Sequence, residues 1–492
     1  MEQKKNNFLP NYPQILQVST RPWLYGLSQK YKKSIATIND IPEDELMDIK
    51  EKGFDIIWTM GIWALGSNGL KHDQTEPSRL KGYKEILPDF TIHDVIGSPY
   101  SIMEYTPNKQ ICPNGEKDLQ SFREKLKKYN IKLMLDFVPN HSSIDSPWIS
   151  TNIDYYIRAP KSSNSSYDEK RYLPNGVAYA GIKNVVYWTD VAQLNYWNPE
   201  TVRFMINKIK KIASLCDAIR CDVAQVIVNE EFENNWKEEL FSWGWKKPTE
   251  EFWDVAIKEI KKEYPNFIFL AESYMDGHIE LIKEGFDFCY DKTLLDKLAK
   301  NENCKEISKY INGNKKFNDH LCHFLENHDH NRAMALFKEN SKQAKAAAVI
   351  VYTIPGMKFF FQDQSLGLKN RLEVQLRRSY KENKNEEIFS FYNQFFKIIQ
   401  NDIFKYGKWK NVVLTGKNAD NLLSWIWHNE KENKFFLVIV NYKQTENEGK
   451  ISSSLFISGK ELIDFFTKES ITIKDNIISV HLKEYEFKIL IN

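Results

Sequence analysis

Between about residues 14 and 400, short apolar runs rich in β-branched and aromatic residues alternate with amphipathic segments at helical spacing. This alternation predicts a parallel sheet, because each helical segment returns the chain to begin the next strand beside the previous one. The predicted strands cover residues 15–18, 54–58, 132–137, 218–222, 267–272, 286–290, 321–327 and 358–361. Eight such units indicate an α/β fold, a (β/α)8 TIM barrel with insertions.

Two other stretches indicate further domains. Residues 142–195 are rich in Ser, Asn, Tyr, Pro and Gly and carry little helical periodicity. They are too long for a simple loop in a compact domain, so we interpret them as a small domain inserted after the third strand. Residues 405–492 carry short alternating runs separated by turn residues, which predict a C-terminal antiparallel β-sandwich. The barrel would then comprise residues 1–141 and 196–404.

The bulk properties exclude several classes of partner. The net charge is +2 and the basic residues are not clustered, which argues against nucleic acid and anionic membrane as partners. Residues 1–10 contain no apolar core of a secretory signal, and no run reaches the roughly 20 apolar residues of a membrane helix. The six cysteines show no CxxC spacing and resemble small buried hydrophobes of a reducing compartment. We therefore expect a cytoplasmic protein.

Three of the apolar runs end in a carboxylate, at Asp222, Glu272 and Asp329. The carboxyl ends of parallel strands meet at the face of a barrel that carries the active site. An unpartnered buried charge is costly, so each acid must be solvated by a cleft or held by a partner. A single acid of this kind could belong to a structural ion pair at the barrel rim. Three of them in successive strand–helix units predict a catalytic set.

Their surroundings predict different roles for the first two acids. Arg220 lies two residues before Asp222, on the same side of the strand, and a guanidinium lowers the pKa of a neighbouring carboxyl. Glu272 ends a more apolar run without an adjacent cation, so we expect desolvation to raise its pKa. One charged and one protonated carboxylate are what glycoside hydrolysis uses. The 13 tryptophans and 24 tyrosines would suit a site that stacks sugar rings.

Four motifs follow one another along the predicted barrel. They are Leu135–His141, Ile219–Asp222, Leu270–Glu272 and Phe324–Asp329. In this order they resemble the four motif regions of the α-amylase superfamily, glycoside hydrolase family 13. The resemblance extends over the whole barrel, and the inserted and C-terminal stretches fall where that family has its domains B and C. Each motif alone is a weak signal, whereas the four in order are specific.

The resemblance implies roles for the three acids. Asp222 would be the nucleophile that forms a β-glycosyl-enzyme. Glu272 would protonate the leaving oxygen and then activate water. Asp329 would hold ring hydroxyls and favour the distorted, oxocarbenium-like transition state.

The resemblance also implies a set of supporting residues. Hydrogen bonds to the same sugar would come from His141 and His328, while Arg220 would orient the nucleophile. Tyr100 lies where the family places a stacking platform, although packing within its loop is the alternative. Asp136 and Asn140, at the end of the third strand, would support the site from behind.

The chain departs from the common family pattern at positions that bear on metal binding and specificity. Gln193, within Val191–Asn195, stands where many members have an aspartate that binds calcium, and Asn140 alone does not make a seven-oxygen site. We therefore expect no bound metal and no cofactor. Gln225 and Val226 replace a Lys-His pair, and Ser98 replaces a histidine. These departures leave the linkage and the chain length of the substrate unassigned.

The sequence thus predicts a glycosidase, a retaining hydrolase that cleaves α-glucosidic bonds of oligo- or polysaccharides by double displacement. A transglycosylase (glucanotransferase) or a sugar isomerase on the same scaffold would carry the same triad. A metal-dependent barrel enzyme would carry a Gly-rich phosphate loop after strand seven or eight, and residues 358–363 show none. A non-catalytic sugar-binding protein would lack the nucleophile or the acid. Hydrolysis versus transfer and the oligomeric state stay open.

Overall fold

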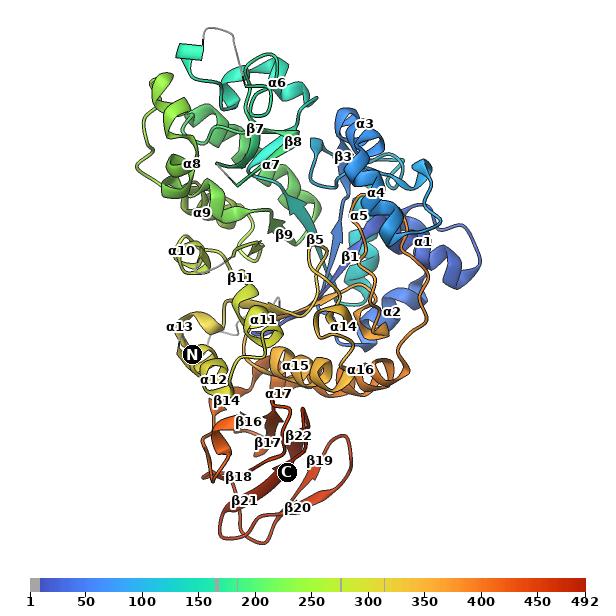
Figure 1. Ribbon diagram of the computed structural model, residues 1–492, viewed down its shortest axis with the longest axis vertical. Coiled ribbons are helices and arrows are strands. Elements are labelled where there is room, and N and C mark those ends of the chain that lie inside the picture. Colours follow the sequence, from blue (N-terminus) through green and yellow to red (C-terminus); the bar gives the residue numbers. More distant parts are fainter. Residues whose placement is uncertain (1–8, 164–167, 184, 275–276, 314) are drawn as a thin grey trace.

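The eight predicted strands form one closed parallel barrel (Figure 1). The computed structural model describes residues 9–163, 168–183, 185–274, 277–313 and 315–492. Around the barrel the strands follow the order β1-β13-β12-β11-β10-β9-β5-β2. Their bounds are β1 (Gln14–Ser19), β2 (Ile56–Met60), β5 (Lys132–Phe137), β9 (Ala218–Cys221), β10 (Ile268–Ala271), β11 (Phe288–Asp291), β12 (Leu321–Phe324) and β13 (Met357–Phe361). The TIM-barrel prediction is confirmed.

Helices pack around the outside of the barrel, and α7 (Pro199–Leu215) shows why they form. Asn198 caps this helix by accepting a hydrogen bond from the backbone N–H of Glu200, and Pro199 occupies its first position. Its buried apolar side chains recur at helical spacing, as the sequence predicts. Other covering helices are α1 (Thr20–Tyr31), α2 (Glu43–Glu51), α5 (Glu116–Lys128), α9 (Phe252–Glu263), α11 (Lys292–Ala299), α15 (Ser341–Thr353) and α16 (Glu386–Ile399).

Two excursions of the chain lie at the end of the molecule opposite the C-terminal strands (Figure 1). The first, between β2 and α5, contains a two-stranded sheet and two α-helices: β3 (Trp63–Leu65), β4 (Ile102–Pro107), α3 (Ser67–Thr75) and α4 (Pro77–Ile86). The second follows β5 and contains a three-stranded antiparallel sheet in the order β6-β8-β7. Its strands are β6 (His141–Ser143), β7 (Tyr179–Ile182) and β8 (Val186–Gln193).

The C-terminal part of the chain forms two antiparallel sheets, as predicted. The larger has the order β14-β16-β17-β22-β19-β20 and the smaller β15-β18-β21. Side chains of β17 (Lys434–Asn441) alternate between two apolar clusters: Leu437 and Ile439 face the smaller sheet, while Val438 and Val440 join the core of the barrel. The sandwich is therefore packed onto the barrel by the outer face of one of its own strands. The exact domain boundaries stay predictions.

The remaining strands of these sheets are β14 (Lys408–Asn411), β15 (Leu414–Thr415), β16 (Leu422–Asn429), β18 (Asn447–Ser452), β19 (Glu461–Asp464), β20 (Ser470–Thr472), β21 (Ile477–Leu482) and β22 (Phe487–Ile491). In the part of the chain that the structure describes, no helix has the length and apolar character needed to cross a membrane.

The predicted strand ends need a correction, because each of the three acids lies beyond its strand. β9 ends at Cys221 and β10 at Ala271, one residue before Asp222 and Glu272. β12 ends at Phe324, well before Asp329. The side chain of Asn327 accepts hydrogen bonds from the backbone N–H groups of Asp329 and His330, which turns the chain out of the strand.

Lys358 lies fully buried near the start of β13, at the face of the barrel opposite the acids. Its ammonium donates hydrogen bonds to the backbone oxygen of Phe404, at 3.2 Å, and of Tyr12. Beside it, Lys405 and Asp55 form a buried ion pair of 2.8 Å. Burial, reinforced by the charge of Lys405, lowers the pKa of Lys358 to about 7.

We predict that Lys358→Met raises the free energy of unfolding at pH 7 by about 1–3 kcal/mol, because it removes a buried cation. Between about pH 7 and 10.5 the unfolded chain binds the Lys358 proton and the folded chain does not, so stability rises with pH over this window. Lys358→Met should flatten that rise in urea titrations at several pH values. The exposed Lys460→Met is the control; equal slopes in wild type and Lys358→Met would contradict the prediction.

Candidate active site

A buried guanidinium links the first two acids. Arg220 lies on β9, between Asp136 on β5 and Leu270 on β10, and its side chain is fully buried. Its Nη1 donates a hydrogen bond of 2.5 Å to Oδ1 of Asp222. Its Nη2 lies 2.7 Å from Oε1 of Glu272. The sequence predicts the contact of Arg220 with Asp222, and the structure adds the contact of Arg220 with Glu272.

Glu272 has more partners than its apolar strand suggested. The expectation that it lacks a neighbouring cation is wrong, because β9 and β10 are adjacent in the barrel and Arg220 reaches across. In addition, Oε2 accepts a hydrogen bond of 2.6 Å from the backbone N–H of Val223. Oε1 accepts one of 2.7 Å from the hydroxyl of Tyr274. A carboxylate with three partners is held in one orientation.

Burial raises the pKa of both Asp222 and Glu272 above their usual values, against the opposing effect of Arg220. The direction expected for Glu272 is confirmed, and so is its cause. The low pKa expected for Asp222 is wrong, because desolvation outweighs the guanidinium when both groups leave water. The negative charge of Asp329 nearby raises both further. The two carboxyls therefore titrate as a coupled pair.

Asp329 has the low pKa instead. Burial raises the pKa of this carboxyl, but the contact with His328 outweighs burial and leaves it well below the usual range. Nε2 of His328 lies 3.0 Å from Oδ2 of Asp329 and 2.7 Å from the hydroxyl of Tyr100. On the other edge of the ring, Nδ1 lies 2.6 Å from Nε2 of Gln17 on β1. The histidine is thus held on both sides.

Aromatic rings enclose the guanidinium. Those of Trp58, Tyr100 and Tyr290 each lie with their centroid 5.2–5.5 Å from the Arg220 carbon. Cation–π contacts of this kind stabilise a desolvated cation. Tyr100 is therefore packed against Arg220 and His328 at its hydroxyl end, and partly exposed. This position is compatible with both roles considered for Tyr100, a stacking platform for a sugar ring and packing within its loop.

The residues expected behind the site lie there. Asp136 is buried and accepts hydrogen bonds of 3.0 Å from Nε1 of Trp58 and from the backbone N–H of Gly61. Burial raises its pKa. His141 lies at the start of β6, and burial lowers its pKa to about 4, so it is neutral at pH 7. Nδ2 of Asn140 lies 3.2 Å from Nδ1 of His141.

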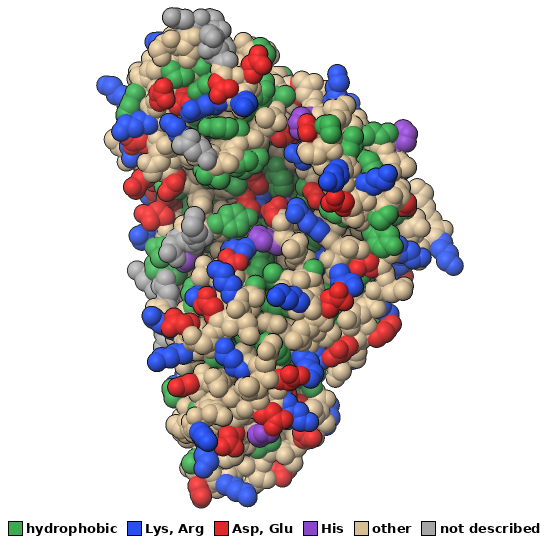
Figure 2. Space-filling view, in the orientation of Figure 1, with side chains coloured by type: hydrophobic (Ala, Val, Ile, Leu, Met, Phe, Trp, Pro, Cys, Tyr) green, Lys and Arg blue, Asp and Glu red, His purple; other side chains and the backbone are tan. Residues whose placement is uncertain are grey.

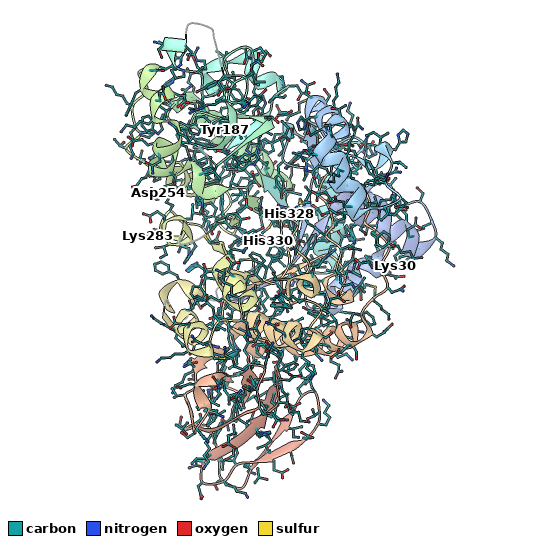
Figure 3. The ribbon with its side chains drawn as sticks, in the orientation of Figure 1. Lys30, Tyr187, Asp254, Lys283, His328 and His330 are labelled. Carbon is teal, nitrogen blue, oxygen red and sulfur yellow. The ribbon has the colours of Figure 1, made fainter. Side chains whose placement is uncertain are left out.

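The surface is hollowed between the inserted β6–β8 sheet and the α3–α4 segment, and acidic side chains show inside the hollow (Figure 2). His328 and His330 are labelled below it in Figure 3. Sequence reasoning missed His330, Gln17, Trp58 and Tyr274. For His330 the signal was its place directly after Asp329. Gln17, Trp58 and Tyr274 belong to no motif in the sequence, and only the fold places them beside His328, Arg220 and Glu272.

The family model described as "Alpha amylase, catalytic domain" matches residues 49–475. The chain belongs to the alpha-amylase family. "Alpha-amylase 3" of Dictyoglomus thermophilum is 26% identical over 280 residues, 51% of this chain and 50% of that protein. A "4-alpha-glucanotransferase" of Thermotoga neapolitana is 23% identical over 337 residues, 65% of each chain.

Solved structures show the same fold. The maltogenic alpha-amylase AmyB of Thermotoga neapolitana superposes with a TM-score of 0.69 at 18% identity, over 98% of both chains. The chain spans about half the length of the first curated relatives that it matches.

The donor set does not fit the calcium site expected of many alpha-amylase family members. The side-chain nitrogen of the fully buried Gln193 donates to Oδ1 of Asn140, at 2.8 Å, and to its backbone oxygen, at 3.0 Å. Two oxygens that could ligate a cation thus face an N–H donor. Among the residues that the structure describes, no group of three or more His, Cys, Asp or Glu is placed to hold a metal. The two hydrogen bonds from Gln193 to Asn140 connect β8 to the end of β5.

We predict that EDTA leaves the melting temperature unchanged, because Gln193 occupies the oxygens of Asn140. Gln193→Ala should lower the melting temperature by a few degrees, since the buried oxygens lose their donor at about 1–3 kcal/mol. Added calcium should not restore it. Differential scanning calorimetry with EDTA or calcium measures both effects; a loss of stability with EDTA, or rescue of Gln193→Ala by calcium, would sink the idea.

Proposed function

We propose that the protein is a glycosidase, a retaining hydrolase of α-glucosidic bonds in oligo- or polysaccharides. The observation that carries this proposal is the contact of one buried guanidinium with both Asp222 and Glu272. A shared guanidinium brings the two carboxyls close together, which supports the short carboxyl separation of a retaining enzyme over the wider one of an inverting enzyme. Asp329 completes the set of three acids.

The charges of Arg220, Asp222 and Glu272 support different roles for the two acids. One guanidinium offsets one negative charge, and burial raises the pKa of both carboxyls, which supports a resting pair of one carboxylate and one carboxylic acid. In the first step Asp222, as carboxylate, attacks the anomeric carbon, and Glu272 gives its proton to the leaving oxygen. The product is a β-glycosyl ester on Asp222. In the second step Glu272 takes a proton from water, which attacks the same carbon and releases the sugar with its original α configuration.

Two hydrogen-bond partners of Glu272 favour its ionised form. The backbone N–H of Val223 and the hydroxyl of Tyr274 stabilise the carboxylate that remains once the proton has left. Asp329, kept ionised by His328, stabilises positive charge on the sugar ring in the transition state. His141 and His328 would donate hydrogen bonds to sugar hydroxyls, and Tyr100 would stack on the ring.

The proposed substrate is a carbohydrate, and the proposed location of the protein is the cytoplasm.

Transfer to a second sugar is the alternative outcome of the same chemistry. The similarity to a protein named 4-alpha-glucanotransferase favours it as the second candidate. Hydrolysis and transfer share the first step and differ in the acceptor that attacks the glycosyl-enzyme. Product analysis on maltose, isomaltose, trehalose, sucrose, maltodextrin and pullulan separates the two and identifies the linkage.

We predict that Asp222→Ala and Glu272→Gln each lower kcat on maltodextrin by about 10⁴-fold, with little change in melting temperature. Azide should then distinguish their roles on an activated aryl α-maltoside. It should give the β-azide with Asp222→Ala, because azide attacks the substrate directly. It should give the α-azide with Glu272→Ala, a further variant that leaves room for azide, because azide attacks the glycosyl-enzyme.

The exposed Glu432→Gln, in the turn between β16 and β17, serves as the control and should retain wild-type activity. Near-normal activity of Asp222→Ala, or the same azide anomer from both variants, would refute the assigned roles.

We predict that Tyr274→Phe shifts the alkaline limb of the pH profile of kcat/KM upward by about one unit. The Tyr274 hydroxyl stabilises the Glu272 carboxylate and so lowers the pKa of Glu272. Without it the pKa rises, and the protonated acid persists to higher pH. Tyr187→Phe, on β8, is the control. An unchanged or acid-shifted limb would contradict the role of Tyr274.

A further inference from the structure

Neither the sequence motifs nor the proposed mechanism assigns a role to His330, although it lies among the catalytic acids. It follows Asp329 directly, and its side chain is half-buried. The centroid of its ring lies 6.4 Å from that of Tyr274 and 5.9 Å from that of Phe324, at the end of β12. The hydroxyl of Tyr274 in turn donates to Glu272. His330 therefore lies on the Glu272 side of the site.

The side chain of Asn327 fixes which ring nitrogen of His330 carries a proton. Oδ1 of Asn327 accepts hydrogen bonds of 3.0 Å from the backbone N–H groups of Asp329 and His330. Backbone N–H groups only donate, so the atom that they meet is the amide oxygen. Nδ1 of His330 lies 2.6 Å from the same oxygen. Two acceptors would repel at this distance, so Nδ1 carries the proton and donates it to Asn327.

His330 is neutral at pH 7, which leaves its other nitrogen as a hydrogen-bond acceptor. Burial, reinforced by the positive charge of Lys292, lowers the pKa of His330 to about 4. The negative charges of Asp329 and Asp296 oppose this shift without cancelling it. A neutral imidazole carries one proton, so with Nδ1 protonated the lone pair lies on Nε2.

The lone pair on Nε2 of His330 is open to a ligand. Among the residues that the structure describes, none makes a hydrogen bond to this atom. Nε2 is not one of the polar atoms that the fold buries without a partner, so part of its surface stays accessible. His328, labelled next to it in Figure 3, differs in this respect: it is fully buried, and its Nε2 contacts Tyr100 and Asp329.

An acceptor in this place fits a hydroxyl group of the substrate. In the proposed mechanism Glu272 protonates the oxygen of the leaving sugar, so a side chain beside Glu272 faces that sugar and not the ring held by Asp329. Sugar hydroxyls are donors that a neutral imidazole nitrogen can accept. The nearby ammonium group of Lys292 is engaged by Asp296.

We propose that His330 binds the leaving sugar of the substrate through Nε2, which accepts a hydrogen bond from one of the hydroxyl groups of that sugar. When the leaving sugar has departed, the same nitrogen can hold a hydroxyl of an acceptor sugar. This inference rests on the proposed function, and it makes His330 a residue that distinguishes a sugar from other leaving groups.

The test compares two substrates that carry the same maltosyl group and differ in the leaving group. Release of glucose from maltotriose uses the contact with His330, whereas release of nitrophenol from para-nitrophenyl α-maltoside does not. His330→Asn keeps an amide N–H near the position of Nδ1, for the contact with Asn327, but has no atom at the position of Nε2. The ratio of kcat/KM for maltotriose to kcat/KM for the nitrophenyl maltoside should fall about tenfold in His330→Asn.

His330→Gln is the matched variant. Its side-chain amide reaches the position of Nε2, so the ratio should stay within about threefold of wild type. A purely structural role of His330 predicts the opposite order, because Gln loses the hydrogen bond to Asn327 and Asn keeps it. The exposed His93→Asn is the control and should leave the ratio unchanged.

NMR of the full chain with labelled histidine nitrogens tests the tautomer independently of activity. The resonances of His330, identified by their loss in His330→Asn, should show a proton on Nδ1 and none on Nε2. A proton on Nε2, or the same substrate ratio in active wild type and His330→Asn, overturns this inference and leaves the proposed function standing. If the wild type cleaves neither substrate, this inference falls, and the product analysis above decides the proposed function separately.

Discussion

The contact of Arg220 with two carboxylates is the interaction on which the candidate site depends. Removing a charged group from water is costly, and the cost is recovered only when its partners are well placed. Here Asp222 and Glu272 provide the opposite charge, and the faces of three aromatic rings cover the guanidinium. Because the guanidinium joins adjacent strands, the closed barrel itself positions the two acids.

The site contains a second group of charges, which acts on the first through the negative charge of Asp329. His328 is held between Gln17 and Tyr100, and its contact with Asp329 lowers the pKa of that carboxyl, whereas burial raises the pKa of Asp222 and of Glu272. Two systems with opposite tendencies, one raised in pKa and one lowered, allow acid and base chemistry at the same pH. In the proposed mechanism, the proton of Glu272 can therefore move while Asp329 stays ionised.

The sequence could predict the barrel and the positions of the three acids, because apolar runs and the residues that follow them are local signals. It could not predict the pKa of Asp222, which depends on the burial of Arg220, Glu272 and Asp222 together. Gln17 and Tyr274 also escaped notice. A lone glutamine in a strand and a tyrosine in a loop carry no mark until the folded chain places them beside His328 and Glu272. The sequence pattern carries no information about contacts between residues that meet only when the barrel closes.

The departures from the common family pattern gain a physical meaning in the structure. Gln225 stands where many relatives have a lysine, and its side-chain oxygen accepts a hydrogen bond of 2.7 Å from the backbone N–H of Tyr274. A lysine has no acceptor with which to make this contact. Gln193 likewise uses an amide donor where an aspartate would offer only oxygens. In both places a neutral amide connects segments of the candidate site: Gln225 holds the backbone at Tyr274, and hence a partner of Glu272, while Gln193 holds Asn140 at the end of β5.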